Sequence, residues 1–377
     1  MPLPGRVRIE TFTVTPLSVP LREPFVIASG RVDVTRAVLG EVTLRDPSTG
    51  NVAAGLGEAA ALPPITREDQ PDVLRLLHDL GDGLARDGEL VLDARLAALG
   101  AHLDALFVDH PVARCGLETA LLDGIARLAQ VPLRVLLGGE DARGIRALVT
   151  DMTLPIAEPA QMAAGARAWW SRGFRVFKVK VGKDRDRDLR AIEAICGATP
   201  QATLRLDANA GFDARDAIDL LHAVEKLGAV VECYEQPCAE DDLEAMREVA
   251  DAVGPPVIAD ESVRTLADLS RLTALRAADG VNLKLAKSGG PLAAFAIGRA
   301  ARAAGMPIMC GGMVETRLGM SAAAHVATAL GGVEFVDLDT AWLLADDPFT
   351  GGYSADGAHY QLSDEPGIGV SRRRPHN

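Results

Sequence analysis

Three acidic residues stand where three successive predicted strands end, and lysines hold the equivalent places on the flanking strands. The acids are Asp207 in LRLDANAG, Glu235 in VECYEQP and Asp260 in VIADES. The lysines are Lys178 and Lys180 in FKVKVG and Lys284 in VNLKLAKSGG. Three carboxylates at this spacing can bind a hard divalent cation such as Mg²⁺, and lysines beside that cation could move a proton. The pattern predicts an enzyme.

The second part of the chain has a strand and helix alternation that would bring these groups together. From about residue 147, short β-branched runs alternate with longer runs of helical period. The predicted strands are 147–154, 174–181, 203–209, 230–236, 256–262, 280–287, 307–314 and 333–339, with a helix in each of the seven gaps. This order predicts an α/β fold, a parallel (β/α)₇β barrel, which is a modified TIM barrel without its last helix.

The first part of the chain predicts a separate α+β capping domain. Residues 8–60 have the pattern of an antiparallel meander, and predicted helices follow near 66–81, 90–106 and 111–129. The predicted domains are a cap over 1–130 and a barrel with the active site over 131–344, with a tail of 345–377 that packs back on the cap.

Side chains two positions apart on a strand share a face, so each barrel strand should deliver its polar groups to one mouth. The pairs are Lys178 with Lys180, Asp207 with Asn209, Asn282 with Lys284, and Asp337 with Asp339. Any one of these residues alone would be read as a surface charge or a core ion pair. Together on consecutive strands they would crowd like charges unless a cation were bound, which favours a functional site.

Composition limits the other classes of function. The chain has 377 residues, of which 48% are hydrophobic, and a net charge of −13, so it can bury a large core and favours no polyanionic partner such as nucleic acid. No signal-like segment or membrane-spanning run stands out, and the five scattered cysteines fit reduced thiols, so we expect a cytoplasmic protein. We expect a small-molecule substrate, no membrane partner and a homo-oligomer. HExxH, GxSxG, Walker A and GxGxxG motifs do not occur.

Six motifs in order resemble the enolase superfamily, and within it the muconate lactonizing enzyme subgroup. They are KVKVG, DANAG, EQP, ADES, KLAKSGG and GGMVET. The resemblance extends to PLREPFVIASG and to the GEAA stretch at 57–60, and so covers nearly the whole chain.

The resemblance implies a role for each of these residues. Asp207, Glu235 and Asp260 correspond to the ligands of one Mg²⁺, for which Mn²⁺ is expected to substitute. Lys180 and Lys284 correspond to acid and base groups on opposite faces of the substrate. Lys178 is expected to help neutralise the substrate carboxylate and to hold down the pKa of Lys180. Asn209 and Glu261 would lie next to the metal ligands.

Elementary chemistry agrees with these roles. A proton α to a carboxylate is very weakly acidic, and its removal places a second negative charge on the carboxylate oxygens. A cation fixed there stabilises that charge most in the transition state, and enolase-superfamily sites are described in these terms. A lysine acts as a base only when it is neutral. Two lysines that face one carbon permit removal on one face and return on the other, which is racemisation or epimerisation.

The last predicted strand distinguishes reactions within the subgroup. VEFVDLDTAW carries Asp337 and Asp339, a DxD pair that resembles the dipeptide epimerases, where it receives the substrate's N-terminal ammonium. Cycloisomerases and o-succinylbenzoate synthases bind no such amine, and two aspartates would repel their dianionic substrates. A Mg²⁺-dependent dipeptide epimerase is therefore the predicted function. Thr153 and Ser29 are further predicted substrate-binding residues.

One departure from the pattern bears on the substrate. L-Ala-D/L-Glu epimerases are expected to have an arginine in the loop after the N-terminal Pro-Phe. Here the loop spans 24–31, Ser29 and Gly30 hold the candidate positions, and Arg31 is displaced. A dipeptide with a neutral or otherwise different second residue is therefore an open option.

Other readings of the same residues stay open. Within the fold, the chain could be a muconate cycloisomerase, an o-succinylbenzoate synthase or an N-acylamino acid racemase. A different class is a lysine Schiff-base aldolase, because Lys180 and Lys284 stand at strand ends of a barrel. A small-molecule-binding barrel without catalysis leaves the opposed lysines unexplained.

Overall fold

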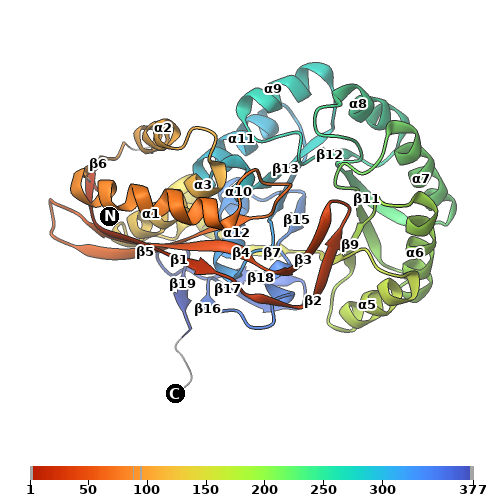
Figure 1. Ribbon diagram of the computed structural model, residues 1–377, viewed down its shortest axis with the longest axis horizontal. Coiled ribbons are helices and arrows are strands. Elements are labelled where there is room, and N and C mark those ends of the chain that lie inside the picture. Colours follow the sequence, from red (N-terminus) through yellow and green to blue (C-terminus); the bar gives the residue numbers. More distant parts are fainter. Residues whose placement is uncertain (1–2, 88, 94–95, 374–377) are drawn as a thin grey trace.

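Eight parallel strands form a barrel ringed by helices, and an α+β cap lies against one side of it (Figure 1). The computed structural model describes residues 3–87, 89–93 and 96–373. The barrel strands are β8 (Met152–Leu154), β9 (Val176–Lys180), β10 (Thr203–Asp207), β11 (Val230–Glu235), β12 (Val257–Ala259), β13 (Gly280–Lys284), β14 (Ile308–Gly311) and β15 (Phe335–Asp337). They pair in chain order, and the Asp151 amide donates to Val336 O at 3.1 Å, which brings β15 back against β8.

One long helix lies in each gap between barrel strands. These helices are α5 (Pro159–Ser171), α6 (Arg185–Ala198), α7 (Ala214–Lys226), α8 (Leu243–Ala252), α9 (Leu266–Leu275), α11 (Pro291–Ala303) and α12 (Arg317–Ala329). The barrel strands are almost continuously buried, as expected for a parallel sheet with side chains packed on both faces. The predicted (β/α)₇β barrel is confirmed.

The predicted strand over 147–154 is wrong in one respect, because the chain forms two strands there. β7 (Ala147–Val149) pairs with β18 of the C-terminal tail, and only β8 belongs to the barrel. Between them the Thr150 amide donates to Ala358 O while the Asp151 amide donates to Val336 O. The hydrogen bonds therefore change partner sheet within two residues, which a β-branched run in the sequence does not reveal.

The cap consists of a four-stranded antiparallel sheet, a hairpin and three helices. Its strands are β1 (Arg6–Leu17), β2 (Pro20–Ile27), β3 (Gly30–Val34), β4 (Arg36–Arg45), β5 (Val52–Ala61) and β6 (Glu89–Val91). Its helices are α1 (Gln70–Asp87), α2 (Ala97–Leu106) and α3 (Pro111–Leu128). The helix predicted over 66–81 begins only at Gln70, where Asp69 accepts from the Gln70 amide, and the run predicted helical from 90 to 106 contains strand β6 before α2.

Two buried glutamates of the cap bind the first turns of two barrel helices. Glu58 on β5 accepts hydrogen bonds from the Thr316 amide at 3.0 Å and from the Gly319 amide at 3.0 Å, at the start of α12. Glu118 on α3 accepts from the Leu292 amide at 2.7 Å, at the start of α11. The first amides of a helix have no partner within the helix and carry positive partial charge, so both carboxylates stabilise the contact between cap and barrel.

The tail makes contacts with both parts of the chain. Its strands are β16 (Phe349–Gly351), β17 (Tyr353–Asp356), β18 (His359–Leu362) and β19 (Val370–Arg372). β18 pairs with β7, while the Ile368 amide donates to Asp123 on α3 and Arg372 pairs with Glu41 on β4. The chain also forms the short helices α4 (Leu133–Gly138), η1 (Glu140–Gly144), α10 (Leu285–Ser288) and η2 (Thr340–Trp342). The division at residue 130 stays a prediction.

A buried histidine links α12, α4 and the tail. His325 Nδ1 lies 3.1 Å from the Arg134 amide that donates to it, and Nε2 lies 3.2 Å from Ile368 O. These contacts fit a neutral ring with its proton on Nε2. Burial, with a smaller contribution from Arg134, lowers the pKa of His325 to about 3.

Stability is therefore expected to fall in acid because of His325. The unfolded chain binds a proton there near pH 6.5, about 3.5 units above the folded value, so protonation favours unfolding as pH falls through 6.5. This residue should cost roughly 2 kcal/mol of unfolding free energy between pH 7 and pH 5. Urea unfolding at both pH values measures this loss of unfolding free energy. The loss between pH 7 and pH 5 should be smaller in His325→Gln than in the wild type, whereas the control His222→Gln, at an exposed position, should match the wild type. Equal differences in all three proteins would contradict the assignment.

Candidate active site

The barrel brings the predicted site residues to the carboxyl ends of its strands, within one buried polar cluster. Exposure is at most 7% for each of Thr153, Lys178, Lys180, Asp207, Asn209, Glu235, Asp260, Glu261, Lys284, Asp337 and Asp339. Below them, on the same strand faces, Cys233, Ile258 and Met309 pack together with Phe335 and fill the barrel interior. The polar groups thus stand on an apolar floor.

Lys178 lies at the centre of the cluster. Its Nζ is 2.6 Å from Asp337 Oδ2, 2.7 Å from Glu235 Oε2 and 3.0 Å from Asp207 Oδ2. Burial by itself lowers the pKa of Lys178, but the surrounding carboxylates outweigh burial and raise that pKa well above its ordinary value. Lys178 is therefore a fixed positive charge.

Lys180 and Lys284 lie on opposite walls of the barrel. They end β9 and β13, which are the second and sixth of eight strands in sheet order. Lys180 Nζ donates to Asp207 Oδ2 at 2.6 Å, and Lys284 Nζ donates to Asp260 Oδ2 at 2.6 Å. The three strands between these walls carry Asp207, Glu235 and Asp260. Two amines thus flank a row of carboxylates.

The carboxylates differ in their electrostatic surroundings. Burial raises the pKa of Glu235 to about 7, and burial likewise raises the pKa of Glu261 to about 7. Burial would also raise the pKa of Asp207, but Lys178 and Lys180 outweigh it and the pKa is lowered. Asp260, held between Lys284 and Lys287, has a pKa well below its ordinary value for the same reason, although burial opposes it.

Neighbouring polar groups fix these carboxylates in place. Asn282 Nδ2 donates to Glu235 Oε1 at 2.8 Å, and Asn209 Nδ2 donates to Glu261 Oε1 at 3.3 Å. The Gln236 carboxamide oxygen accepts from the Asp260 amide at 2.8 Å. Asn209 and Gln236 have positive φ values of 42° and 34°, which are costly for residues other than glycine and typical of functional sites.

Lys287 belongs to the cluster although sequence reasoning gave it no role. The strand predicted over 280–287 ends at Lys284, and a single helical turn, α10 (Leu285–Ser288), follows. That turn swings Lys287 back so that its Nζ donates to Asp260 Oδ1 at 2.6 Å and to Asn282 O at 2.9 Å. The spacing of three residues between Lys284 and Lys287 could have indicated it, since it is one turn of helix.

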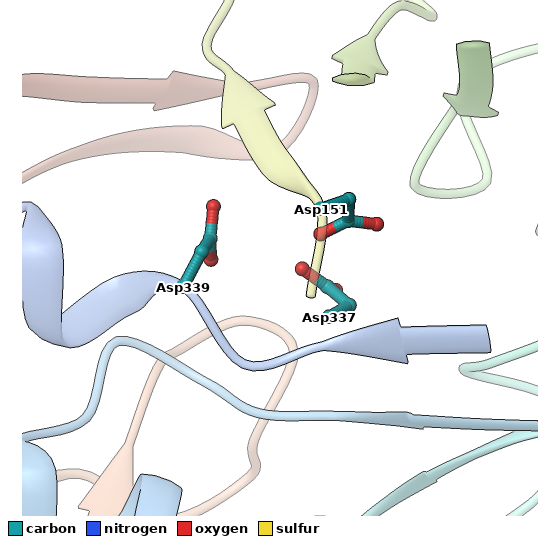
Figure 2. A group of neighbouring side chains, drawn as sticks. All are labelled: Asp151, Asp337 and Asp339. Carbon is teal, nitrogen blue, oxygen red and sulfur yellow. The ribbon is translucent and has the colours of Figure 1, made fainter. Parts of the chain in front are cut away.

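A second group of acids gathers where β15 meets the start of β8. Asp151, Asp337 and Asp339 each have one carboxylate oxygen that lies within 4.8 Å of those of the other two (Figure 2). Thr153 donates from its amide to Asp339 Oδ2 at 2.5 Å. Asp151 was missed from sequence because a continuous strand was predicted across it. Its partner is Arg205, whose Nη1 lies 2.9 Å from Asp151 Oδ2.

Ser29 differs from the other predicted site residues because it is exposed. It lies in the turn between β2 and β3, at the tip of the cap hairpin. The hairpin docks beside the barrel mouth, since Val26 O accepts from the Ile156 amide and the Arg22 amide donates to Leu343 O. Arg31 pairs with Asp33 at 2.8 Å within the hairpin, and both side chains are exposed.

The donor set suits a hard divalent cation. Seven buried carboxylates face five buried basic groups, which leaves a formal excess of two negative charges. The carboxylates are Asp151, Asp207, Glu235, Asp260, Glu261, Asp337 and Asp339, and the basic groups are Lys178, Lys180, Lys284, Lys287 and Arg205. Glu261 Oε2 is buried without a hydrogen-bond partner among the described residues. Oxygen donors with excess negative charge are those that Mg²⁺ prefers.

The predicted metal ligands are not the tightest acidic group. Among the described residues, only Asp151, Asp337 and Asp339 have oxygens that all lie within 4.8 Å of one another. A lysine ammonium group pairs with one carboxylate oxygen of each of Asp207, Glu235 and Asp260, and these ammonium groups lie between the acids. Basic groups bind acids in both groups, so the assignment of Asp207, Glu235 and Asp260 as metal ligands rests on their strand order and motifs and stays a prediction.

No helix within the described part of the chain is both long enough and apolar enough to cross a membrane.

Comparison with known proteins places this chain in a family. The family described as "Enolase C-terminal domain-like" matches residues 161–375. An aromatic dipeptide epimerase from Herpetosiphon aurantiacus is 37% identical, over 96% of this chain and 98% of its own length. An L-Ala-D/L-amino acid epimerase from Populus trichocarpa is 36% identical, over 95% of this chain and 85% of its own length.

A solved structure agrees over the whole fold. The dipeptide epimerase from Enterococcus faecalis, complexed with Mg and the dipeptide L-Leu-L-Tyr, is 31% identical, with a TM-score of 0.86 over 97% of this chain and 99% of that one. The chain belongs to the enolase superfamily and, within it, to the dipeptide epimerases. It is an isomerase that acts on amino acid derivatives.

Proposed function

We propose that the protein is a Mg²⁺-dependent dipeptide epimerase that inverts the Cα next to the dipeptide carboxylate by 1,1-proton transfer. The observation that carries this proposal is the placement of Lys180 and Lys284 on opposite walls of the barrel, with Asp207, Glu235 and Asp260 on the strands between them. A substrate carbon held between the two amines has one on each face.

The chain's own groups divide the work in this proposal. Asp207, Glu235 and Asp260 hold the metal, which when bound stabilises the second negative charge on the substrate carboxylate. Lys178, already a fixed positive charge, attracts the same carboxylate. One of Lys180 and Lys284 removes the Cα proton, and the other returns a proton on the opposite face.

The second acidic group binds the other end of the dipeptide. Asp337 and Asp339 are buried, and burial together with Asp337 raises the pKa of Asp339 to about 6. Such acids stay ionised at lower cost when a cation lies beside them. The substrate's N-terminal ammonium supplies that cation and anchors the dipeptide so that its Cα lies between the lysines.

The hairpin favours a second residue that carries no negative charge. Arg31 is committed to Asp33, while Phe25 and Ile27 on β2 are buried apolar side chains. An acidic side chain would need a basic partner, and the two arginines of this hairpin, Arg22 and Arg31, both have exposed side chains. L-Ala-L-Phe is therefore a suitable test substrate. An N-acylamino acid with an apolar side chain would meet the same uncharged surroundings. An N-acylamino acid racemase is therefore the second candidate.

The charge on the amine separates these candidates. We expect N-acetyl-L-Ala-L-Phe to have a kcat/KM at least about 100-fold below that of L-Ala-L-Phe, because acetylation removes the charge and leaves buried acids unpaired. N-methyl-L-Ala-L-Phe is the matched control, because it adds bulk and keeps the charge. Measuring Cα–H exchange in D₂O by NMR gives the three rates.

Variants at the acids complete this test. Asp339→Asn should raise KM and also lower kcat, since a substrate held loosely at its amine no longer presents its Cα correctly. Preference for acetylated substrate would favour the racemase instead. Equal efficiency on both substrates would make the DxD pair structural.

A further inference from the structure

Three buried carboxylates converge where the end of β15 meets the segment before β8. Figure 2 shows the carboxylates of Asp151 and Asp337 turned toward each other, with Asp339 projecting from the neighbouring loop. Asp151 and Asp339 have no exposed surface, and Asp337 is 6% exposed. Three such acids repel one another strongly unless positive charge lies among them.

The hydrogen bonds leave two of these oxygens unused. Asp151 Oδ2 accepts from Arg205, Asp339 Oδ2 accepts from the Thr153 amide, and Asp337 Oδ2 accepts from Lys178. Asp151 Oδ1 and Asp339 Oδ1 are buried and have no hydrogen-bond partner among the described residues. A buried carboxylate oxygen without a donor is destabilising, so these two oxygens call for a donor from outside the chain.

A primary ammonium fits this place better than a second divalent cation does. An ammonium offers three N–H donors and a single charge, which matches oxygens drawn from three carboxylates. Arg205 and Lys178 already lie within 3 Å of two of these acids and would repel a doubly charged ion. A singly charged group meets half that repulsion.

We propose that Asp151 is a third acid of the substrate's ammonium subsite, and that Arg205 is the positioning residue that aims it. This inference rests on the proposed function, because it names a further residue for the same dipeptide. It adds a recognition group that lies 186 residues from the DxD pair, on the strand segment across the barrel seam.

Arg205 is built into the wall in a way that suits this role. Its Nη1 donates both to Asp151 Oδ2 at 2.9 Å and to Val336 O at 2.8 Å, so it ties β10 to the strand that carries Asp337. Its Nε donates to Glu232 at 2.9 Å on the other side. One guanidinium thus fixes the distance between Asp151 and the end of β15.

A pair of ligands that differ only at the amine tests the proposal. L-Ala-L-Phe and N-propionyl-L-Phe have the same skeleton, with hydrogen in place of the ammonium in the second. In Asp151→Asn we expect KM for the dipeptide to rise at least about tenfold, while the inhibition constant of N-propionyl-L-Phe changes less than about twofold. A merely structural aspartate would weaken both ligands together.

Glu232→Gln is the matched control, because it removes the other acid bound to Arg205 and leaves the subsite intact. Both constants should stay at wild-type values in that variant. Arg205→Lys should raise the dipeptide KM in the same direction as Asp151→Asn, because a lysine cannot bind both Asp151 and Val336 O in the same geometry. If circular dichroism shows that Asp151→Asn is unfolded, Asp151→Ser is measured against the same two ligands.

Two results would overturn the role of Asp151. One is an equal loss for both ligands in each folded variant. The other is calorimetric binding of a second Mg²⁺ per chain that Asp151→Asn abolishes, which would make the acids a metal site. Failure of the proposed function looks different, because the wild type itself would then leave the Cα of L-Ala-L-Phe unchanged in D₂O.

Discussion

Replacing Lys180 or Lys284 by alanine is expected to lower the rate of epimerisation by about 10³-fold, while Mg²⁺ still binds. Each lysine serves one face of the substrate carbon, so inversion needs both. The two amines lie on strands β9 and β13, four strands apart in a barrel of eight, and neither can reach across to replace the other. Loss of either one should therefore stop inversion.

Proton exchange without inversion is the sharper readout. In Lys180→Ala, Lys284 can still remove the Cα proton of one epimer and return a deuteron to the same face. We expect each variant to exchange only one epimer of the dipeptide in D₂O, and the two variants to choose opposite epimers. NMR of the L,L and L,D forms measures this directly.

The control for this prediction is Lys226→Ala on α7, where the lysine is exposed and lies outside the buried cluster of site residues. It should epimerise at the wild-type rate. Wild-type epimerisation in Lys180→Ala or Lys284→Ala would rule out the two-base mechanism. Exchange of both epimers by one variant would place both reactions on a single lysine.

The sequence predicts the barrel and the strand ends because parallel strands buried on both faces have a distinct composition. A carboxylate or lysine at the end of such a run is expected at the mouth of the barrel, because the carboxyl ends of all the strands meet there. Asp207, Glu235 and Lys284 each end an observed strand, one to three residues before the predicted strand ends at 209, 236 and 287. Spacing along the chain is therefore sufficient for these residues.

Contacts between the last barrel strand, β15, and the first, β8, cannot be predicted from local sequence patterns. Thr153 binds Asp339 across 186 residues, and Asp151 lies beside Asp337 only because β15 returns to β8. No sequence motif near Asp151 predicts its contact with Asp337. Arg205 is a comparable case, because an inward-facing arginine on a strand is assigned a partner only once the opposite wall is known.

The pairing of particular oxygens also escapes the sequence. Strand order indicates that Asp260 and Lys284 are neighbours, but the one-turn helix after Lys284 adds Lys287 to the same carboxylate. Local backbone geometry decides that contact. Ser29 lies in an exposed turn, and its contact with the substrate stays a prediction.

Removal of the metal is expected to abolish turnover, and Asp260→Asn should weaken Mg²⁺ binding at least about 100-fold. The seven buried carboxylates of the cluster exceed its five buried basic groups by two charges, so a divalent cation that binds Asp207, Glu235 and Asp260 should stabilise the folded protein. At 100 times its dissociation constant, Mg²⁺ would add about 2.7 kcal/mol of stability. Calorimetric titration and thermal unfolding, each with and without Mg²⁺, measure both effects.

The dependence on Mg²⁺ separates a metal ligand from a structural aspartate. Asp260 also accepts from Lys284 and Lys287, so Asp260→Asn should lower the thermal midpoint even without metal. A metal ligand must in addition lose the Mg²⁺-dependent rise in that midpoint, whereas exposed Asp251→Asn on α8 should keep it. Full turnover after exhaustive chelation, or a wild-type Mg²⁺ response in Asp260→Asn, would contradict the assignment of a metal to this site. The three acids would then need no cation beyond the lysines that already pair with them.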